Sequence, residues 1–284
     1  MPTEPLRRLD DFVVFAEGLD HPECATRGPD GLTYAGGEAG QVYRINPDDT
    51  FEQIGTTGGF LLGLCLDAGG NVYACDIKHN AVIRVTARGD VSTYSTGTPQ
   101  RPMVNPNYPV FDAGGNLYVT ASGHWKQHDG CIYRIRPGGE TKVVNESARQ
   151  FPNGCALSPD GRWLYVVLSL MPGVARLLIR DDGTLSEPER VVELPGTVPD
   201  GVAFDVAGNL FISCYAPDTI YRLSPSGELA VLAHDPQRVT FASPTNINFC
   251  GEDRRTLVVA NLARWHLTRT QMPDPGHPLH HPTL

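Results

Sequence analysis

Residues 199–223 read "PDGVAFDVAGNLFISCYAPDTIYRL", and this stretch contains the pattern that decides the fold. An apolar segment leads into a turn that ends in Gly208-Asn209, and a second apolar segment follows the turn. The stretch closes on "IYRL", in which apolar and polar residues alternate, as they do in a half-buried β-strand. It therefore predicts three consecutive strands of one antiparallel sheet.

The same pattern recurs along the whole chain. Related segments are "LGLCLDAGGN" at 62–71, "YPVFDAGGN" at 108–116 and "GCALSPDGRW" at 154–163, with degenerate copies from Cys24 and Ile247. A more variable fourth segment, such as "EQIG" or "VSTY", closes each copy. A spacing of roughly 40 to 47 residues indicates a repeat architecture. Six copies of four strands predict an all-β fold, a six-bladed β-propeller with four-stranded antiparallel blades. A series of two-sheet sandwiches is the alternative, but it does not explain so regular a period.

The ends of the chain complete this prediction. "FVVFAEG" at 12–18 is expected to close the ring beside "TLVVANL" at 256–262. Because propeller blades pack only on their neighbours, residues 1–284 are expected to form one domain with an ordered core from about 12 to 268. The Pro/His-rich residues 272–284 are expected to form a loose, solvated tail.

Composition limits the classes of function and the compartment. The net charge of -9 over 284 residues argues against binding to nucleic acid or to an anionic membrane. The chain has no apolar run typical of a signal peptide or a membrane span. Its seven cysteines include no Cys-x-x-Cys pair, which favours a reducing cytoplasm.

One position in each repeat is expected to point into the mouth of the central channel. It is the residue at the start of each inner strand, and reading it along the chain gives Glu23, Leu62, Asn107, Asn153, Asp200 and Asn246. Taken singly, Asn and Asp beside Pro or Gly are ordinary turn formers. In phase with the repeat, however, they place carboxylate and amide oxygens on one axis, and such oxygens suit a hard divalent cation.

These residues belong to segments that resemble a known family, which includes gluconolactonase, regucalcin (senescence marker protein) and luciferin-regenerating enzyme. The resemblance spans about residues 12–268 and is carried by "PNGCALSPDGRWLYV" from Pro152, "PDGVAFDVAGNLFIS" from Pro199, "NYPVFDAGGNLYVT" from Asn107 and "SPTNINFCGEDRRTLVVAN" from Ser243. It implies a six-bladed propeller that holds one divalent metal ion in its channel.

The resemblance also implies roles for particular residues. The metal ligands of the family map onto Glu23, Asn153 and Asp200, and the family's substrate-contacting Asn maps onto Asn107. With so few protein ligands, we expect moderate, exchangeable binding, with Ca²⁺ as the first candidate and Mg²⁺, Mn²⁺ or Zn²⁺ as alternatives. Cys24 and Cys155 stand close to two of these ligands in sequence but are not expected to bind the metal.

The chain departs from the family at several positions. Tyr108 follows Asn107 where the family has Asp, and Asn105 stands where sugar-lactone members tend to carry Arg, although Arg101 is near in sequence. These departures favour a less polar lactone or ester over an aldonolactone. The candidate substrate contacts at the mouth are Asn107, Asn105, Arg101, Leu62, His124, Trp125 and Asn246.

The sequence thus predicts a metal-dependent hydrolase that opens a small lactone or a related cyclic ester. Asp200 is expected to bind the metal and to act as the general base, while Asn107 orients substrate or water. Two alternatives stay open: a non-catalytic binding or scaffold propeller of the NHL type, and a lyase or isomerase built on the same fold.

Overall fold

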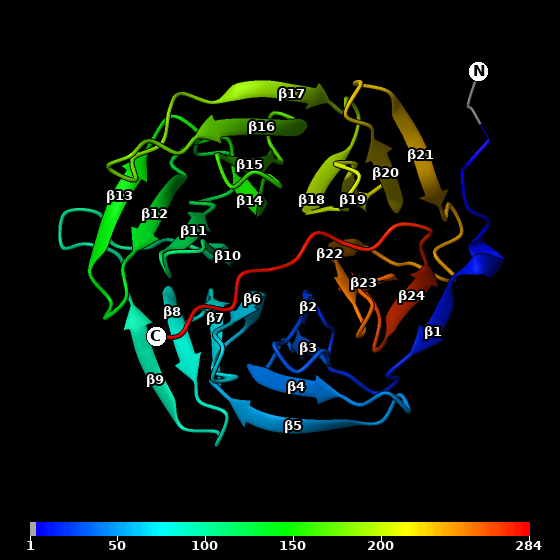
Figure 1. The fold of residues 1–284 in the computed structure, drawn as a ribbon, viewed down its shortest axis with the longest axis horizontal. Helices are drawn as coiled ribbons and strands as arrows, with labels where there is room; N and C mark the ends of the chain where they lie inside the picture. The colour runs from blue at the N-terminus through cyan, green and yellow to red at the C-terminus, as the bar shows by residue number, and fades with distance from the viewer. Residues whose placement is uncertain (1–3) are drawn as a thin grey trace.

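The computed structural model describes residues 4–284 and shows six four-stranded antiparallel sheets arranged around a central axis (Figure 1). The predicted six-bladed β-propeller is therefore confirmed. Within residues 4–284 the one helical element is a single 3-10 turn, η1 (Leu9–Asp11). In each blade one edge strand lies next to the axis and the opposite edge strand forms the outer rim.

The first three blades follow one another directly in sequence. Blade 1 contains β2 (Ala25–Arg27), β3 (Thr33–Gly36), β4 (Gln41–Ile45) and β5 (Phe51–Thr56). Blade 2 contains β6 (Leu61–Leu66), β7 (Val72–Asp76), β8 (Ala81–Val85) and β9 (Val91–Ser95). Blade 3 contains β10 (Pro106–Phe111), β11 (Leu117–Ala121), β12 (Cys131–Ile135) and β13 (Thr141–Asn145).

The next two blades continue the same order. Blade 4 contains β14 (Pro152–Leu157), β15 (Trp163–Leu168), β16 (Gly173–Leu178) and β17 (Glu189–Glu193). Blade 5 contains β18 (Val198–Phe204), β19 (Leu210–Ala216), β20 (Thr219–Leu223) and β21 (Leu229–His234).

Blade 6 joins the two ends of the chain. It contains β22 (Pro244–Cys250), β23 (Thr256–Asn261) and β24 (Leu267–Gln271), and β1 (Val13–Phe15) supplies its outer strand. The N-terminal segment therefore closes the ring, as the sequence predicts. Its direct partner is β24, with Val14 opposite Thr268, so β24 lies between β1 and the expected partner β23.

The repeated Asp-x-x-Gly-Asn motif forms the turn between the first two strands of a blade. In blade 2, Asp67 accepts hydrogen bonds from the backbone N–H groups of Gly69 and Asn71 at 2.9 and 3.0 Å. Asp205 in blade 5 accepts bonds from the backbone N–H and the side-chain Nδ2 of Asn209. These side chains replace backbone partners in the turn, which explains why the motif punctuates the repeat.

Residues 272–284 differ from the loose tail that the sequence suggested. Figure 1 shows this segment (red) crossing in front of the inner strands. Its backbone bonds to strand ends of blades 2 and 5: Val206 N–H donates to Pro275 O, His277 N–H to Phe204 O, and Ala68 N–H to Pro282 O. The segment covers a small cavity of about 60 Å³ between the inner strands. It thereby closes the channel end at which the inner strands finish.

Removal of residues 274–284 should destabilise the propeller. At about 1 kcal/mol for each lost hydrogen bond, offset by the chain entropy that is regained, we expect the free energy of unfolding to fall by about 2–4 kcal/mol. Urea denaturation of the truncated chain measures this change. An unchanged midpoint and slope would contradict the assignment of this segment as a structural closure.

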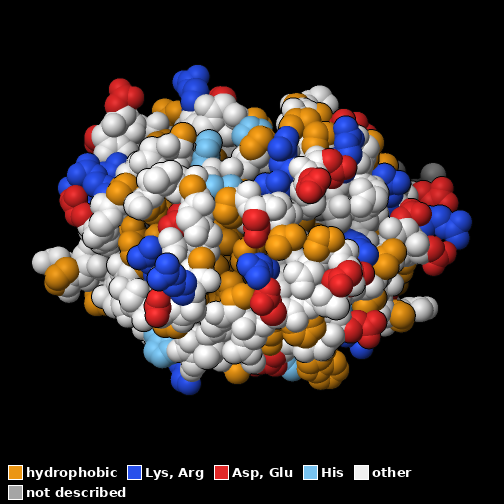
Figure 2. Space-filling model, turned by 60° about the horizontal axis from the view of Figure 1, so that its bottom comes forward, with side chains coloured by type: hydrophobic (Ala, Val, Ile, Leu, Met, Phe, Trp, Pro, Cys, Tyr) orange, Lys and Arg blue, Asp and Glu red, His pale blue; other side chains and the backbone are white. Residues whose placement is uncertain are grey.

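The surface shows no continuous basic area on the face in Figure 2, where Lys and Arg side chains are interspersed with Asp and Glu. This distribution agrees with the acidic net charge of -9. Within residues 4–284, no helix has the length and apolar character needed to cross a lipid bilayer.

Candidate metal and active site

The candidate site lies at the channel end where the inner strands begin. In three blades the chain enters through a residue with positive φ, then a proline, then the channel residue: His21-Pro22-Glu23, Asn105-Pro106-Asn107 and Phe151-Pro152-Asn153. The φ values of the first residues are 43°, 48° and 59°. This left-handed conformation is costly for residues other than glycine, and it persists only where the surroundings hold it in place. It turns the chain sharply from the rim into the channel.

Three buried oxygens at this end have no hydrogen-bond partner among the described residues. They are Oδ1 of Asn107, Oδ1 of Asn153 and Oδ1 of Asp200. The three side chains are 3%, 4% and 6% exposed, so bulk water does not satisfy these atoms. Leaving a buried acceptor unpaired costs about 1–3 kcal/mol, and unpaired acceptors of this kind are rare in folded proteins. Their chemistry fits a hard divalent cation, which binds carboxylate and amide oxygens.

A second carboxylate completes the set. Glu23 is 3% exposed, and its Oε2 accepts a hydrogen bond of 3.0 Å from Nδ2 of Asn246. Thr245 Oγ1 donates to the backbone carbonyl of Glu23 at 2.6 Å, which ties blade 1 to blade 6. Asn246, which the sequence predicts as a substrate contact, thus donates its amide hydrogen bond to a candidate metal ligand.

The two carboxyl groups are costly to ionise in this position. Burial raises the pKa of Asp200 to about 7, and the neighbouring Asn153 amide only partly offsets this shift. Burial and the charge of Asp200 raise the pKa of Glu23 well above its usual range, although the Asn246 amide acts in the opposite direction. A cation would supply the charge that these buried carboxylates lack.

A serine in each of two blades fixes the direction of the asparagine oxygens. Asn107 donates through Nδ2 to Ser122 Oγ at 3.1 Å, and Ser122 donates to Pro152 O in the next blade at 2.9 Å. The same relay runs from Asn153 to Ser169 Oγ at 3.2 Å and then to Pro199 O at 2.7 Å. Since each amide N–H₂ is engaged by a serine, each Oδ1 faces the channel.

These serines are not among the residues predicted from the sequence, although a signal is present. Ser122 and Ser169 follow the second strand of consecutive blades, and Ser213 lies within the second strand of blade 5. Ser213 continues the pattern, since its hydroxyl donates to Thr245 O. The recurrence of serine in phase with the repeat could have indicated that it supports the channel residues.

Replacement of Ser169 by alanine should weaken binding of a divalent cation without unfolding the chain. Loss of an outer-shell partner typically costs about 10- to 100-fold in metal affinity, and we expect a loss in this range. Calorimetric titration with Ca²⁺ measures it. Ser158→Ala is a matched control, because Ser158 is also buried but lies at the opposite end of the β14–β15 hairpin. Equal affinity in both variants would show that the relay does not position Asn153.

Glycines after the channel residues let neighbouring inner strands approach closely. A Cβ on Gly154 would lie 2.5 Å from the carbonyl oxygen of Asp200, and a Cβ on Gly201 would lie 2.7 Å from Cα of Asn246. Real Cβ atoms do not come this close to backbone, so the Asn-Gly and Asp-Gly pairs of the two motifs are required by packing. This close approach brings the Asn153 and Asp200 side chains together.

The predicted substrate contacts divide into two groups. Leu62 is half-buried beside Gly63, where a Cβ would lie 2.7 Å from Asn107 O, so it occupies the blade 2 position of the channel set. Trp125 is 48% exposed on the β11–β12 loop, and its ring meets that of Phe151 edge-on at 4.8 Å. The adjacent His124 is held by Asp129 through Nδ1 at 2.8 Å. Trp125 and His124 thus lie on an exposed loop of blade 3, and Phe151 at the start of blade 4 is in contact with that loop.

Arg101 and Asn105 are engaged elsewhere. The Arg101 guanidinium donates to the carbonyl oxygen of Asp129 and lies 3.7 Å from Glu146, beyond the outer strand β13. Asn105 donates through Nδ2 to Gly123 O at 2.9 Å and so supports the β11–β12 loop. Nearness in sequence to Asn107 suggested substrate contacts, but Arg101 ends the Thr98–Arg101 turn and its guanidinium lies against Asp129 and Glu146.

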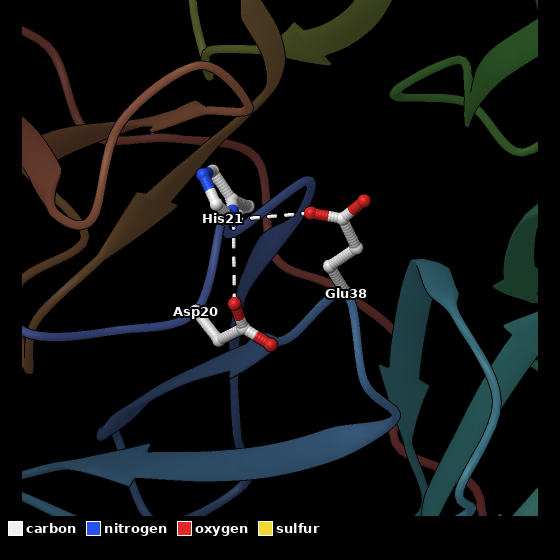
Figure 3. Close-up of side chains that lie close together, drawn as sticks. All are labelled: Asp20, His21 and Glu38. Carbon is white, nitrogen blue, oxygen red and sulfur yellow. Dashed lines mark hydrogen bonds and ion pairs between the residues drawn. The ribbon is translucent and has the colours of Figure 1, made fainter.

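A second group of possible ligands lies near the same rim. His21 Nδ1 is 3.0 Å from Oε2 of Glu38 and 3.3 Å from Oδ1 of Asp20 (Figure 3). The other oxygen of Asp20 already accepts hydrogen bonds from Ala39 N–H and Gln41 Nε2 at 3.1 and 3.0 Å. These three side chains are partly exposed and already interact with one another, so they form an ion-pair cluster without the unpartnered buried oxygens of the channel set.

Sulfur does not compete for the channel. All seven cysteines are free thiols. Cys24 Sγ accepts a hydrogen bond from Leu64 N–H at 3.3 Å, and Cys155 Sγ donates to Tyr108 O at 3.7 Å. Burial raises the pKa of both thiols, which disfavours the thiolate form that binds metals.

Comparison with known proteins identifies related sequences and solved structures with the same fold. A 6-deoxy-6-sulfogluconolactonase of Pseudomonas putida is 32% identical over 172 residues, which are 51% of this chain and 58% of that protein. A gluconolactonase of Zymomonas mobilis subsp. mobilis is 31% identical over 224 residues, 70% of this chain and 60% of that protein. The chain thus spans less than two thirds of the length of these two relatives.

Solved structures share the fold at lower identity. A gluconolactonase of Xanthomonas campestris has a TM-score of 0.79 at 19% identity, covering 92% of this chain and 89% of that chain. Regucalcin of Agrobacterium tumefaciens, a calcium-binding protein, has a TM-score of 0.72 at 15% identity, covering 99% of each chain. The family model of the SMP-30/gluconolactonase/LRE-like region matches residues 38–263. The chain belongs to the SMP-30/gluconolactonase/LRE-like family.

Proposed function

We propose that this protein is a divalent-metal-dependent lactonase, which adds water to a small lactone to give the hydroxy acid. The observation that carries the proposal is the set of three buried, unpartnered oxygens of Asn107, Asn153 and Asp200 beside the buried carboxylate of Glu23. The two curated relatives are named as gluconolactonases, and both names describe lactone hydrolysis.

Glu23, Asn153 and Asp200 would hold the cation in this site. When bound there, it would polarise the lactone carbonyl and stabilise the negative charge that develops on its oxygen, a contribution of several kcal/mol. Three protein ligands leave room for substrate and water, as catalysis requires. Ca²⁺ is the first candidate, since the set contains only oxygen and a structural neighbour is a calcium-binding protein, with Mg²⁺, Mn²⁺ and Zn²⁺ as alternatives.

The chain's own residues would move the proton. The Asp200 carboxylate accepts a proton from water while the water oxygen bonds to the carbonyl carbon, and the same proton passes to the ring oxygen as the C–O bond breaks. Asn107 keeps Oδ1 free because Nδ2 is engaged by Ser122, so this oxygen can accept a hydrogen bond from the attacking water. The Trp125–Phe151 pair and Leu62 would exclude bulk water and contact the apolar part of the substrate.

Stripping and restoring the metal tests this function. The protein is treated with a chelator, dialysed, and assayed with a panel of sugar and non-sugar lactones by the acid that ring opening releases, with and without each of the four cations. We expect acid release that depends on added cation for at least one lactone. Binding of a cation with no acid release from any lactone would instead indicate a scaffold or a non-hydrolytic enzyme.

A further inference from the structure

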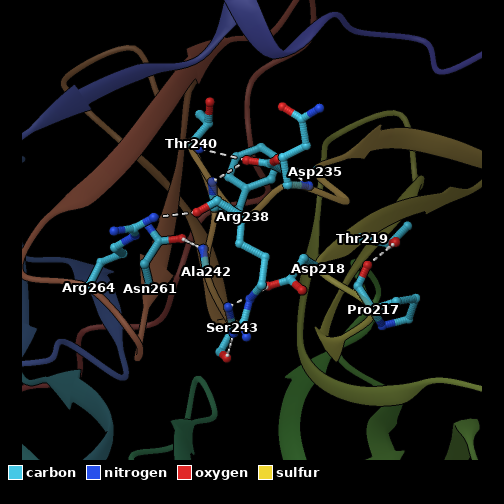
Figure 4. Close-up of polar contacts among 12 residues, drawn as sticks. Pro217, Asp218, Thr219, Asp235, Arg238, Thr240, Ala242, Ser243, Asn261 and Arg264 are labelled. Carbon is cyan, nitrogen blue, oxygen red and sulfur yellow. Dashed lines mark hydrogen bonds and ion pairs between the residues drawn. The ribbon is translucent and has the colours of Figure 1, made fainter.

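Arg238 lies at the seam between blades 5 and 6, outside the set of residues described so far. Its Nε is 3.3 Å from Oδ1 of Asp218, and its Nη2 donates to Ser243 Oγ at 2.6 Å (Figure 4). The side chain of Arg238 is 49% exposed, whereas that of Asp218 is 11% exposed. The guanidinium is therefore held through Nε and Nη2, while about half of the Arg238 side chain stays exposed to solvent.

This seam belongs to the same channel end as the candidate metal site. Ser243 directly precedes β22, the inner strand whose Asn246 bonds to Glu23. Asp218 lies between β19 and β20, on the side of blade 5 from which the Asp200 strand enters the channel. In Figure 4 the Arg238 side chain extends from its loop toward Ser243, at the start of that inner strand.

The loop that carries Arg238 is held in a strained, fixed shape. Arg238, Asp218 and Ser243 all have positive φ, at 58°, 48° and 51°. Asp235 accepts hydrogen bonds from the backbone N–H groups of Thr240 and Phe241 at 2.6 and 3.0 Å. Such strain costs of order 1–3 kcal/mol for each residue and concentrates at binding sites. The guanidinium is thus oriented before any ligand arrives.

The partners of Arg238 occupy the Nε/Nη2 edge of its guanidinium group and leave the Nη1/Nη2 edge free. Nε and one proton of Nη2 are engaged by Asp218 and Ser243, while Nη1 has no partner among residues 4–284. Since the side chain is 49% exposed, Nη1 and the second proton of Nη2 are available as a pair of parallel N–H donors. That edge matches the two oxygens of a carboxylate.

We propose that Arg238 is a specificity-determining residue that binds a carboxylate substituent of the substrate. The identification of that substrate as a lactone rests on the proposed function, and its carboxylate makes it more polar than the substrate that the sequence departures favour. The Arg238–Asp218 pair has no net charge, so recognition depends on the paired donors more than on long-range attraction. A carboxamide offers only one acceptor and places its N–H₂ group against a donor, so this edge discriminates between the two groups.

A non-hydrolysable ligand pair tests the inference separately from turnover. Pyroglutamate and pyroglutamide are lactams that differ only in carboxylate against carboxamide, and their binding to the Ca²⁺-loaded protein is measured by calorimetry or NMR. We expect pyroglutamate to bind about tenfold or more tightly than pyroglutamide, as a charge-assisted hydrogen-bond pair allows. Arg238→Gln should abolish this preference, and Arg238→Lys should keep only part of it.

Arg44→Gln is the matched control, since Arg44 also pairs with an acid and is half-exposed, but lies on β4 away from the inner strands. Thermal unfolding and Ca²⁺ titration of each variant show that the fold and the metal site are intact. Equal binding of both lactams to the unmodified protein, or a preference that survives in Arg238→Gln, would overturn the inference. The same variants are then assayed for hydrolysis of γ-butyrolactone-γ-carboxylate. A preference for pyroglutamate without hydrolysis supports the carboxylate site and counts against the lactonase. Hydrolysis without a preference for pyroglutamate supports the lactonase and counts against the carboxylate site.

Discussion

Asp200→Asn should lose lactone opening by about a thousandfold or more and should no longer bind a divalent cation. The substitution keeps the size of the side chain but removes its charge and its proton acceptor. The metal-free variant should nevertheless be as stable as the unmodified protein, or more stable, because it no longer buries a carboxylate without a counter-charge. Turnover assays, Ca²⁺ calorimetry and thermal unfolding of the metal-free protein measure the three effects.

Asp205→Asn is the control for this variant. Asp205 is 2% exposed and follows the same strand β18, but its carboxylate is satisfied by Asn209 in a turn at the opposite end of the channel. We expect this variant to lose some stability and to keep its cation affinity and turnover. Unchanged turnover in Asp200→Asn would remove Asp200 from the site, whatever the control shows.

The stabilisation that Ca²⁺ provides should grow as pH rises from about 5 to about 8. In the metal-free protein the pKa of Asp200 is raised to about 7, mainly by burial, and that of Glu23 is raised well above its usual range. A carboxyl group whose folded-state pKa exceeds its unfolded value stabilises the fold fully below the unfolded pKa, which is about 4. That stability is lost as pH rises through the folded pKa. The metal-free fold should therefore weaken toward pH 8, where the ionised pair binds Ca²⁺ best.

Melting temperatures with and without saturating Ca²⁺, at constant ionic strength across this pH range, measure the effect. Affinity should fall by up to about tenfold per pH unit for each proton that the cation displaces. If the ligands were exposed carboxyl groups, with a pKa of about 4, the Ca²⁺ affinity would fall only near and below pH 4. Because burial raises the pKa of both Glu23 and Asp200, we expect the Ca²⁺ affinity to fall nearer neutral pH. A Ca²⁺-induced shift that is the same at pH 5 and pH 8, or one that survives in Asp200→Asn, would contradict this account.

The sequence predicted the propeller because each blade repeats the same local chemistry. The Asp-x-x-Gly-Asn turn and the alternating third strand depend on neighbouring residues, so they can be read without tertiary information. The channel residues could be found for the same reason. Asn107, Asn153 and Asp200 stand in phase with the repeat, and the structure leaves one oxygen of each buried and unpartnered.

Features that depend on contacts between distant segments were not predicted. The tail has a Pro/His-rich composition typical of disorder, yet its backbone bonds to Phe204 and Ala68. Arg238 lies in a connecting loop outside the repeated motif, so no periodic signal pointed to it. Nearness in sequence to Asn107 suggested that Arg101 contacts substrate, but its guanidinium bonds to Asp129 and lies near Glu146, contacts that the sequence did not indicate.

A crystal of the protein soaked in Mn²⁺ and measured for anomalous scattering tests the central claim most directly. The claim is that the buried oxygens at the channel mouth bind one divalent cation. It predicts a single strong anomalous peak within about 2.6 Å of oxygens from Glu23, Asn153 and Asp200, the outer limit for oxygen ligands of such cations. A peak on Asp20, His21 and Glu38 with none in the channel, or no peak at all at millimolar Mn²⁺, would contradict it.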